Sequence, residues 1–136
     1  MILADTSAWV EYDRSTQSRV DRRMARLIGQ EGPLAVTEPV MMEVLAGAWD
    51  DAREEDLRRL LLRFDWLPFD PVVDFDGAVR VYRTCRGAGV TPRGLVDCMV
   101  AAVASRRGAT ILAHDVDLAR VASVFNLSLD RASLRP

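Results

Sequence analysis

The chain has 136 residues, of which 49% are hydrophobic and 28% are charged, and its formal net charge is -2. This composition is typical of one ordinary globular domain and excludes a disordered chain. All 18 basic residues are arginine, which excludes mechanisms that need a lysine, such as Schiff-base formation and P-loop phosphate binding. The near-neutral balance also argues against general electrostatic binding to nucleic acid or membranes.

The N-terminal segment and the cysteines favour a cytoplasmic protein with no membrane partner. Asp5 interrupts the first apolar run, so no signal peptide is expected. The longest apolar run, residues 98–104, is too short to span a bilayer. Cys85 and Cys98 have neither a C-x-x-C nor a zinc-site spacing, and we expect both to be buried free thiols. Because no repeat or linker divides the sequence, residues 1–136 are expected to form a single domain.

Short apolar runs along the chain predict buried strands. The candidates are residues 2–4, 34–37 and 110–113, with weaker ones at 66–69 and 127–129. Strands that alternate with helices need crossover connections. The chain is therefore expected to be an α/β protein with a central parallel sheet of four to five strands and helices on both faces.

Helical patterns occupy the intervening segments. Apolar residues at helical spacing predict helices around residues 20–28 and 57–64. Thr37 is a candidate N-cap for a helix over residues 38–48. Thr91 followed by Pro92 predicts the start of a further helix.

Four carboxylates either follow a predicted strand or interrupt an apolar helix face. Asp5 and Asp115 follow strands, and the carboxyl ends of parallel strands line the crevice where ligands bind. Glu43 and Asp97 lie in apolar stretches of helix, where an isolated charge is unfavourable to bury. Any one of these acids could cap a helix or pair with an arginine, but the set as a whole favours convergence.

Convergent carboxylates require a cation, because two of them about 5 Å apart repel by roughly 3 kcal/mol at an effective dielectric constant near 20. A carboxylate set without a histidine or cysteine cluster favours Mg²⁺ or Mn²⁺, and these ions bind substrate phosphates. Asp117 lies two residues beyond Asp115 and is a further candidate ligand. His114 could act as a ligand or a base, although a single histidine beside a strand end is more often packed or hydrogen-bonded.

Four segments that contain these acids resemble the acidic motifs of PIN-domain ribonucleases. They are residues 2–10 (ILADTSAWV), 40–47 (VMMEVLAG), 96–104 (VDCMVAAVA) and 113–118 (AHDVDL). Their order, spacing and total length resemble those of VapC-type toxins of type II toxin–antitoxin systems. The resemblance covers essentially the whole chain, and it implies a three-layer α/β/α PIN-like fold.

The resemblance implies a metal-dependent endoribonuclease that hydrolyses phosphodiester bonds with a Mg²⁺-activated water, or with Mn²⁺ in its place, and leaves 5′-phosphate and 3′-hydroxyl ends. The implied site residues are the catalytic acids Asp5, Glu43, Asp97 and Asp115, the metal ligands Asp5, Asp97, Asp115 and Asp117, and the supporting hydroxyl of Ser7. The chain departs from the family pattern at Gly94, where a hydroxyl residue is frequent, and at Leu118, where an aromatic residue is frequent. Neither position is a metal ligand.

An acidic pocket needs basic residues around it to hold RNA. Arg83, Arg86 and Arg93 are the first candidates, with Arg106 and Arg107 behind them, although a solvated helix end is an equally good interpretation for each.

The resemblance also implies a cognate VapB-type antitoxin and a homodimer. Trp9, Tyr12, Met41 and Trp49 could line such surfaces, while burial in the core is the safer interpretation for these residues.

Two alternatives compete with the nuclease interpretation. Phosphatases and receiver-like proteins also place aspartates at strand ends, but they rely on a lysine and this chain has none. A catalytically silent PIN-like module that only binds RNA or a protein is the other alternative. Loss of an acid would indicate such a module, yet all four positions are filled.

Overall fold

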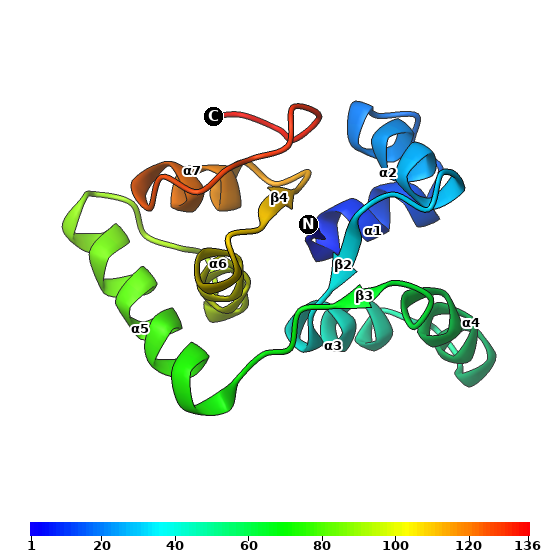
Figure 1. Cartoon of the computed structure of the whole chain (residues 1–136), viewed down its shortest axis with the longest axis horizontal. Coiled ribbons are helices and arrows are strands. Elements are labelled where there is room, and N and C mark those ends of the chain that lie inside the picture. Colours follow the sequence, from blue (N-terminus) through cyan, green and yellow to red (C-terminus); the bar gives the residue numbers. More distant parts are fainter.

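Four short parallel strands form the centre of the computed structural model, which describes residues 1–136 (Figure 1). They are β1 (Ile2–Ala4), β2 (Leu34–Val36), β3 (Asp65–Trp66) and β4 (Thr110–Leu112), in the order β3-β2-β1-β4. All residues of β1 and β2 are buried, as expected of strands covered on both faces. The predicted α/β class and parallel sheet are confirmed. The fifth candidate strand contributes only one parallel bridge, between Leu129 and Ile111.

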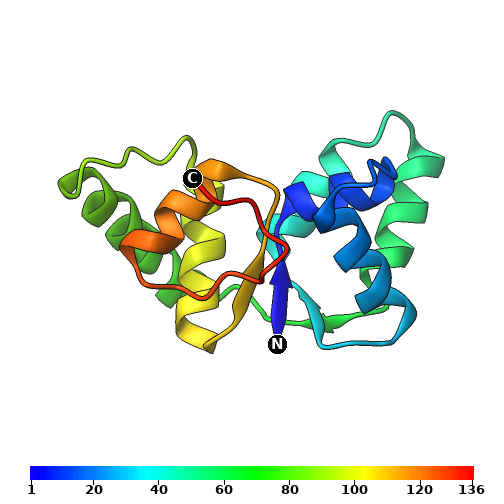
Figure 2. The same ribbon diagram turned by 90° about the horizontal axis from the view of Figure 1, so that it is seen from above.

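Seven helices connect and cover the strands. They are α1 (Thr6–Asp13), α2 (Arg19–Gly29), α3 (Glu38–Ala46), α4 (Asp51–Leu61), α5 (Pro71–Gly87), α6 (Leu95–Arg107) and α7 (Val116–Val124). Helices α1 to α4 gather beside β2 and β3, whereas α5 to α7 gather beside β4 (Figures 1 and 2). With helices on both sides of the sheet, the arrangement agrees with the predicted three-layer PIN-like fold. No helix has the length and apolar character needed to cross a membrane.

The predicted start of the helix that carries Asp97 is wrong. Helix α6 begins at Leu95, three residues after Pro92. Gly94 is its N-cap, with an extended backbone (φ -155°, ψ 161°) that interrupts helical geometry between Pro92 and Leu95. Because Gly94 has no side chain, no side-chain hydrogen bond caps this helix. The segment 88–94 is therefore a loop beside the acids. Helix α3 likewise ends at Ala46, two residues earlier than predicted.

One cluster of 31 buried hydrophobic residues packs the sheet against the helices. Cys85 and Cys98 are both free and buried within it, as predicted.

An ion pair between α5 and α6 is also part of the interior. Arg106 donates to both oxygens of Asp74, at 2.9 and 2.7 Å, and the Asp74 side chain is almost fully buried. Burial alone would raise the pKa of Asp74, but these bonds, with one from the Asp70 amide, hold it below its ordinary value. Arg106 is partly exposed, but its guanidinium group is engaged by Asp74, which leaves it poorly placed for the RNA contact considered above.

The strand order explains where a site can form. The chain leaves β1 toward β2 on one side, and β4 later joins β1 on the other side. At such a reversal the connections diverge and leave a crevice at the carboxyl ends of the strands. Asp5 follows β1 directly and Asp115 follows β4 after two residues, so the topology brings both acids to that crevice.

Candidate active site

Asp5 forms the most buried part of the site, with 3% of its surface exposed. It is the N-cap of α1, and its Oδ2 accepts hydrogen bonds from the Ser7 amide at 3.1 Å and the Ser7 hydroxyl at 2.7 Å. The same hydroxyl oxygen accepts a bond from the His114 amide at 2.8 Å, which ties the end of β4 to Asp5. Ser7 therefore lies beside the first aspartate, where it was predicted.

The other oxygen of Asp5, Oδ1, is buried and has no hydrogen-bond partner. Burial raises the pKa of Asp5, the two bonds from Ser7 offset this only in part, and the charges of Glu43 and Asp115 raise it further. A buried carboxylate oxygen without a partner is costly unless a cation or a proton satisfies it. This atom fits a metal ligand.

Glu43 reaches the site from α3. The Thr6 hydroxyl donates to Glu43 Oε1 at 2.7 Å, so the residue after Asp5 fixes the second acid. Sequence reasoning missed Thr6, although its position directly after the β1 aspartate was a usable signal.

Asp97 lies in the first turn of α6, facing the other acids. Burial and the negative charges of Asp5, Asp115 and Glu43 raise the pKa of Asp97 to about 7, and the charge of Arg93 opposes the shift. A carboxyl group ordinarily titrates near pH 4. The shift is what like charges around a shared, partly desolvated space produce.

Asp115 and Asp117 are joined by an arginine from the loop before α6. Asp115 is the N-cap of α7, and its Oδ1 accepts from the Asp117 amide at 2.9 Å. Arg93 contacts Asp115 Oδ1 at 3.2 Å and Asp117 Oδ2 at 2.8 Å. Arg120 pairs with the other oxygen of Asp117 at 3.0 Å. The guanidinium of Arg93, 71% exposed, thus supplies positive charge at the rim of the acid cluster.

Three of these acids and Arg93 border a hollow of about 330 Å³, whereas Asp5 and Asp117 lie outside its lining. Its lining consists of Glu43, Arg93, Gly94, Leu95, Val96, Asp97 and Asp115. No three His, Cys, Asp or Glu side chains are already arranged to hold one ion, and two of the acids are engaged elsewhere, Glu43 with Thr6 and Asp115 with Arg93. The donor set consists of carboxylates alone, which suits a hard cation such as Mg²⁺ or Mn²⁺.

The remaining candidate residues lie outside this hollow. Arg83 and Arg86 are exposed on the last turns of α5, where Arg86 lies over the Tyr82 ring at 5.8 Å. His114 Nε2 lies 3.4 Å from Glu11 on α1, and its Nδ1 is buried without a partner. The structure therefore brings together Asp5, Glu43, Asp97 and Asp115, with Asp117 and Arg93 beside them, and it leaves Arg83 and Arg86 apart.

Comparison with known proteins identifies the family. The model of the PIN domain family matches residues 2–124. This chain belongs to the PIN-domain family. The VapC ribonuclease Mb1587 of Mycobacterium bovis is 44% identical over 128 residues, which cover 93% of this chain and 96% of the relative. Ribonuclease VapC11 of Mycobacterium tuberculosis matches to the same extent. These matches confirm the predicted PIN-domain family and the predicted class of enzyme, an endoribonuclease.

Solved PIN-domain structures share the fold at low sequence identity. The VapBC2 complex of Rickettsia felis bound to a promoter DNA fragment has a TM-score of 0.75 at 16% identity and covers 98% of this chain and 99% of its own. VapC20 of Mycobacterium tuberculosis, a toxin that cleaves the sarcin-ricin loop, has a TM-score of 0.68 at 17% identity over the full length of both chains. At these identities the likeness extends to the fold alone, and it agrees with the predicted architecture.

Proposed function

We propose that this PIN-domain chain is the toxin of a type II toxin–antitoxin system and that Asp5, Glu43, Asp97 and Asp115 are its catalytic acids. The observation that carries the proposal is the meeting of four carboxylates from four segments at one edge of the sheet, one of them with a pKa of about 7. Such a cluster destabilises the fold through like-charge repulsion, and carboxylates with strongly shifted pKa values are typical of functional sites. RNA phosphodiester hydrolysis is the use that fits a VapC-type chain.

Asp5, Asp97, Asp115 and Asp117 are the proposed ligands of Mg²⁺ or Mn²⁺. The unpartnered Oδ1 of Asp5 and the mutual repulsion felt by Asp97 support this role. A bound ion would lower the pKa of a bound water and offset charge on the phosphate.

The chain's own residues prepare the site by fixing orientations. Ser7 holds Asp5 Oδ2 and leaves Oδ1 available, while Thr6 holds one oxygen of Glu43 and leaves the other to accept a bond from a water. Arg93 is the proposed contact to an RNA phosphate at the rim, because its guanidinium already lies over the acids and is mostly exposed. Arg83 and Arg86 are proposed as contacts farther along the strand.

The activity is tested with purified full-length chain freed of antitoxin. RNA should be cleaved with Mg²⁺ or Mn²⁺ present and remain intact in EDTA. Sequencing of 5′-phosphate ends after induced expression then identifies the cleaved sites. Absence of cleavage under all these conditions, with RNA binding retained, would instead establish the silent binding module considered above.

A VapB-type antitoxin is the proposed protein partner. A groove of about 200 Å³ between α1, α3 and α4 is lined mainly by hydrophobic residues, among them Trp9, Leu57 and Trp49. Trp9 is buried, whereas Trp49 is 79% exposed. An exposed tryptophan beside an apolar groove is typical of a protein-binding surface. Trp49→Ala should leave the unfolding temperature nearly unchanged and weaken antitoxin binding at least tenfold, as measured by calorimetry.

A homodimer, a single domain over residues 1–136 and a cytoplasmic location complete the proposal. One continuous core supports the single domain. Exposed Val72, Phe75 and Val79 on one side of α5 are candidates for the dimer contact. Sedimentation of the full chain and of Val79→Glu tests the dimer, because a charge in this face should shift the protein to monomers.

A further inference from the structure

Helix α2 has two faces of opposite character. Val20, Met24 and Leu27 point into the core and are buried. On the other face, arginines stand at positions i, i+3, i+4 and i+7: Arg19, Arg22, Arg23 and Arg26. This spacing places all four on one side of the helix over about 10 Å of its length.

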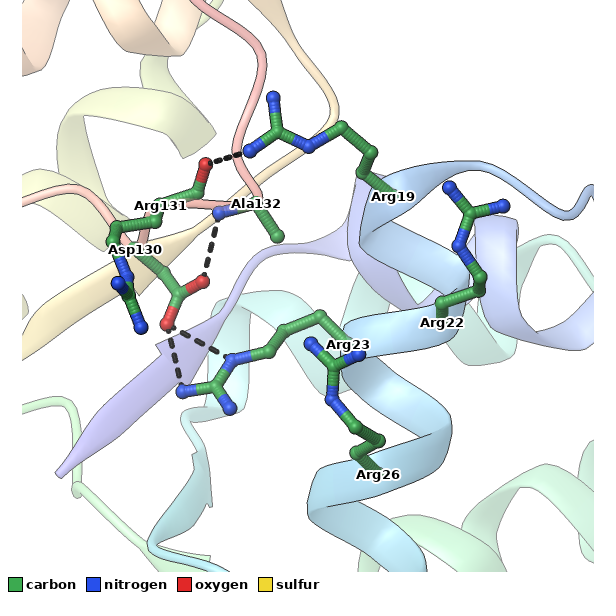
Figure 3. A pocket seen from close by; sticks show the side chains of 7 residues that line it. All are labelled: Arg19, Arg22, Arg23, Arg26, Asp130, Arg131 and Ala132. Carbon is green, nitrogen blue, oxygen red and sulfur yellow. Dashed lines mark hydrogen bonds and ion pairs between the residues drawn. The ribbon is translucent and has the colours of Figure 1, made fainter.

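The C-terminal segment completes a hollow against this face. Asp130, Arg131 and Ala132 lie opposite the helix and line, with the four arginines, a space of about 390 Å³ (Figure 3). Arg23 donates to Asp130 Oδ2 from Nε at 3.1 Å and from Nη2 at 3.0 Å. Arg19 donates to the backbone carbonyl of Arg131 at 2.8 Å. These bonds fix the two walls relative to each other.

Most of the positive charge in the hollow has no counter-charge. Five arginines and one aspartate line it, for a formal charge of +4, although the whole chain carries -2. Of the five arginines, only Arg23 forms an ion pair with a carboxylate. Arg22, Arg26 and Arg131 are exposed and have no acidic partner. The positive charge that remains without an acidic partner therefore suits an anionic ligand.

We propose that this arginine hollow, defined by Arg19, Arg22, Arg23, Arg26 and Arg131, binds backbone phosphates of the RNA substrate. The proposal rests on the proposed ribonuclease function. The planar guanidinium group donates in pairs to phosphate oxygens. The lining contains one small apolar residue, Ala132, and no aromatic one, so it lacks the apolar anchors typical of a protein interface. A polar, multiply charged lining favours a polyanion.

The hollow and the acid cluster are attached to the same strand end. Ser133 follows Ala132 in the same turn, and its hydroxyl accepts a bond from the Ala113 amide at 3.1 Å. Ala113 immediately precedes His114 and Asp115. The turn that carries Arg131 therefore lies beside the strand that positions Asp115. An RNA strand cleaved at the acid cluster can extend to the hollow, which would hold nucleotides beyond those at the scissile bond.

The test is RNA binding by full-length protein that cannot cleave. A fluorescent single-stranded RNA is titrated with Asp97→Asn and with Asp97→Asn carrying Arg22→Gln and Arg26→Gln. These two arginines are exposed and make no ion pair, so their loss leaves the contact between Arg23 and Asp130 intact. The dissociation constant should rise about tenfold at 0.1 M salt. The slope of log K against log salt should shrink by about 1.4, the value for two lost phosphate contacts on a single strand.

The matched control carries Arg58→Gln and Arg59→Gln, which remove the same charge from exposed positions on α4. It should bind RNA like Asp97→Asn alone. Equal weakening by both double variants would reduce the effect to net charge and overturn the proposal. Unchanged RNA binding by the α2 variant, or its binding of polyglutamate in preference to RNA, would also overturn it.

Cleavage assays separate this proposal from the function on which it rests. With Asp97 intact, Arg22→Gln with Arg26→Gln should raise KM and leave kcat near that of the unaltered chain. If the unaltered chain cleaves no RNA, the ribonuclease function fails. If it cleaves and the α2 variant has the same KM, only the hollow fails.

Discussion

The acid cluster and the arginine hollow both bring like charges together, but they differ in the segments that supply the charges and in their exposure to water. The acids are drawn from four segments that the strand order brings together, and Asp5 is buried while Asp97 is half-buried. The arginines of the hollow come mostly from one helix and remain largely exposed. Burial disfavours the charged form of a group more strongly than the nearness of a like charge does in solvent. The acids therefore need a cation or protons, whereas the solvated arginines remain charged without a ligand.

The two sites also differ in the groups that hold their charged side chains in place. Neutral hydroxyls hold two of the acids, Ser7 at Asp5 and Thr6 at Glu43, so their negative charge is kept. In the arginine hollow, the carboxylate of Asp130 holds Arg23 and joins the two walls, and this ion pair neutralises one positive charge. The comparison indicates that the acid cluster is built to concentrate charge, and that the hollow is built to hold its shape.

The largest effect should follow from neutralising one acid of the cluster. Asp97→Asn keeps the shape of the side chain but removes a proposed metal ligand, so we expect kcat for RNA cleavage to fall about 1000-fold, equivalent to roughly 4 kcal/mol of transition-state stabilisation. Cleavage of a fluorescent RNA in Mg²⁺ measures this. Asp76→Asn, at an exposed position on α5, is the matched control and should retain full activity. Full activity of Asp97→Asn would remove it from the catalytic machinery.

The pH dependence of stability should also distinguish the acid cluster. The pKa of Asp97 is raised from 3.8 to about 7, so between these values the folded state binds more protons than the unfolded state. The stability contributed by this proton is present below about pH 4 and is lost as pH rises to about 7.

Without metal, the free energy of unfolding should therefore decline across this range more steeply in the unaltered chain than in Asp97→Asn. Urea unfolding in EDTA at several pH values measures the difference, and the comparison cancels groups such as Asp74, whose lowered pKa has the opposite effect. Mg²⁺ should restore the stability of the unaltered chain near pH 7 and leave the variant almost unchanged. Parallel pH profiles for the two proteins would show that burial and the other acids do not raise the pKa of Asp97.

Two members of the acid cluster could be predicted from the sequence because their positions follow from strand ends, and Glu43 and Asp97 because each interrupts an apolar stretch of helix. A short apolar run that ends in an acid predicts a residue at the sheet edge, as for Asp5 and Asp115. The pairing of Arg93 with Asp115 and Asp117 could not be predicted, since it depends on the loop that Gly94 creates by delaying α6.

Only one wall of the arginine hollow, helix α2, could be predicted from the sequence. The apolar spacing of Val20, Met24 and Leu27 predicted α2 and its buried face, and the arginines on the opposite face follow from the same periodicity. The second wall could not be anticipated, because Asp130 lies 107 positions after Arg23. Contacts over such separations depend on tertiary packing, which no local pattern encodes.

A smaller effect should come from Arg93, the cation that already contacts the acid cluster. Arg93→Gln removes a positive charge from Asp115 and Asp117, so the acids should bind Mn²⁺ about three to five times more tightly, as expected for loss of an exposed ion pair. Calorimetry with Mn²⁺ alone measures the change. Arg83→Gln removes the same charge from α5, outside the hollow beside the acids, and should leave the affinity for Mn²⁺ unaltered. Equal tightening in both variants would indicate a general charge effect.

The smallest effect on ligand binding should come from the single acid of the arginine hollow. In Asp130→Asn the amide oxygen can still accept the bond from the Ala132 amide, but the charged partner of Arg23 is lost. The free energy of unfolding should fall by about 1 to 2 kcal/mol. RNA should nevertheless bind the Asp97→Asn protein two to three times more tightly when Asp130→Asn is added, because the hollow then loses its one negative charge and keeps all its arginines. Asp76→Asn, which removes the same negative charge from α5, should change neither quantity. Weaker RNA binding by Asp130→Asn would mean that the geometry of the walls, which Asp130 maintains, matters more to the phosphates than the charge it neutralises.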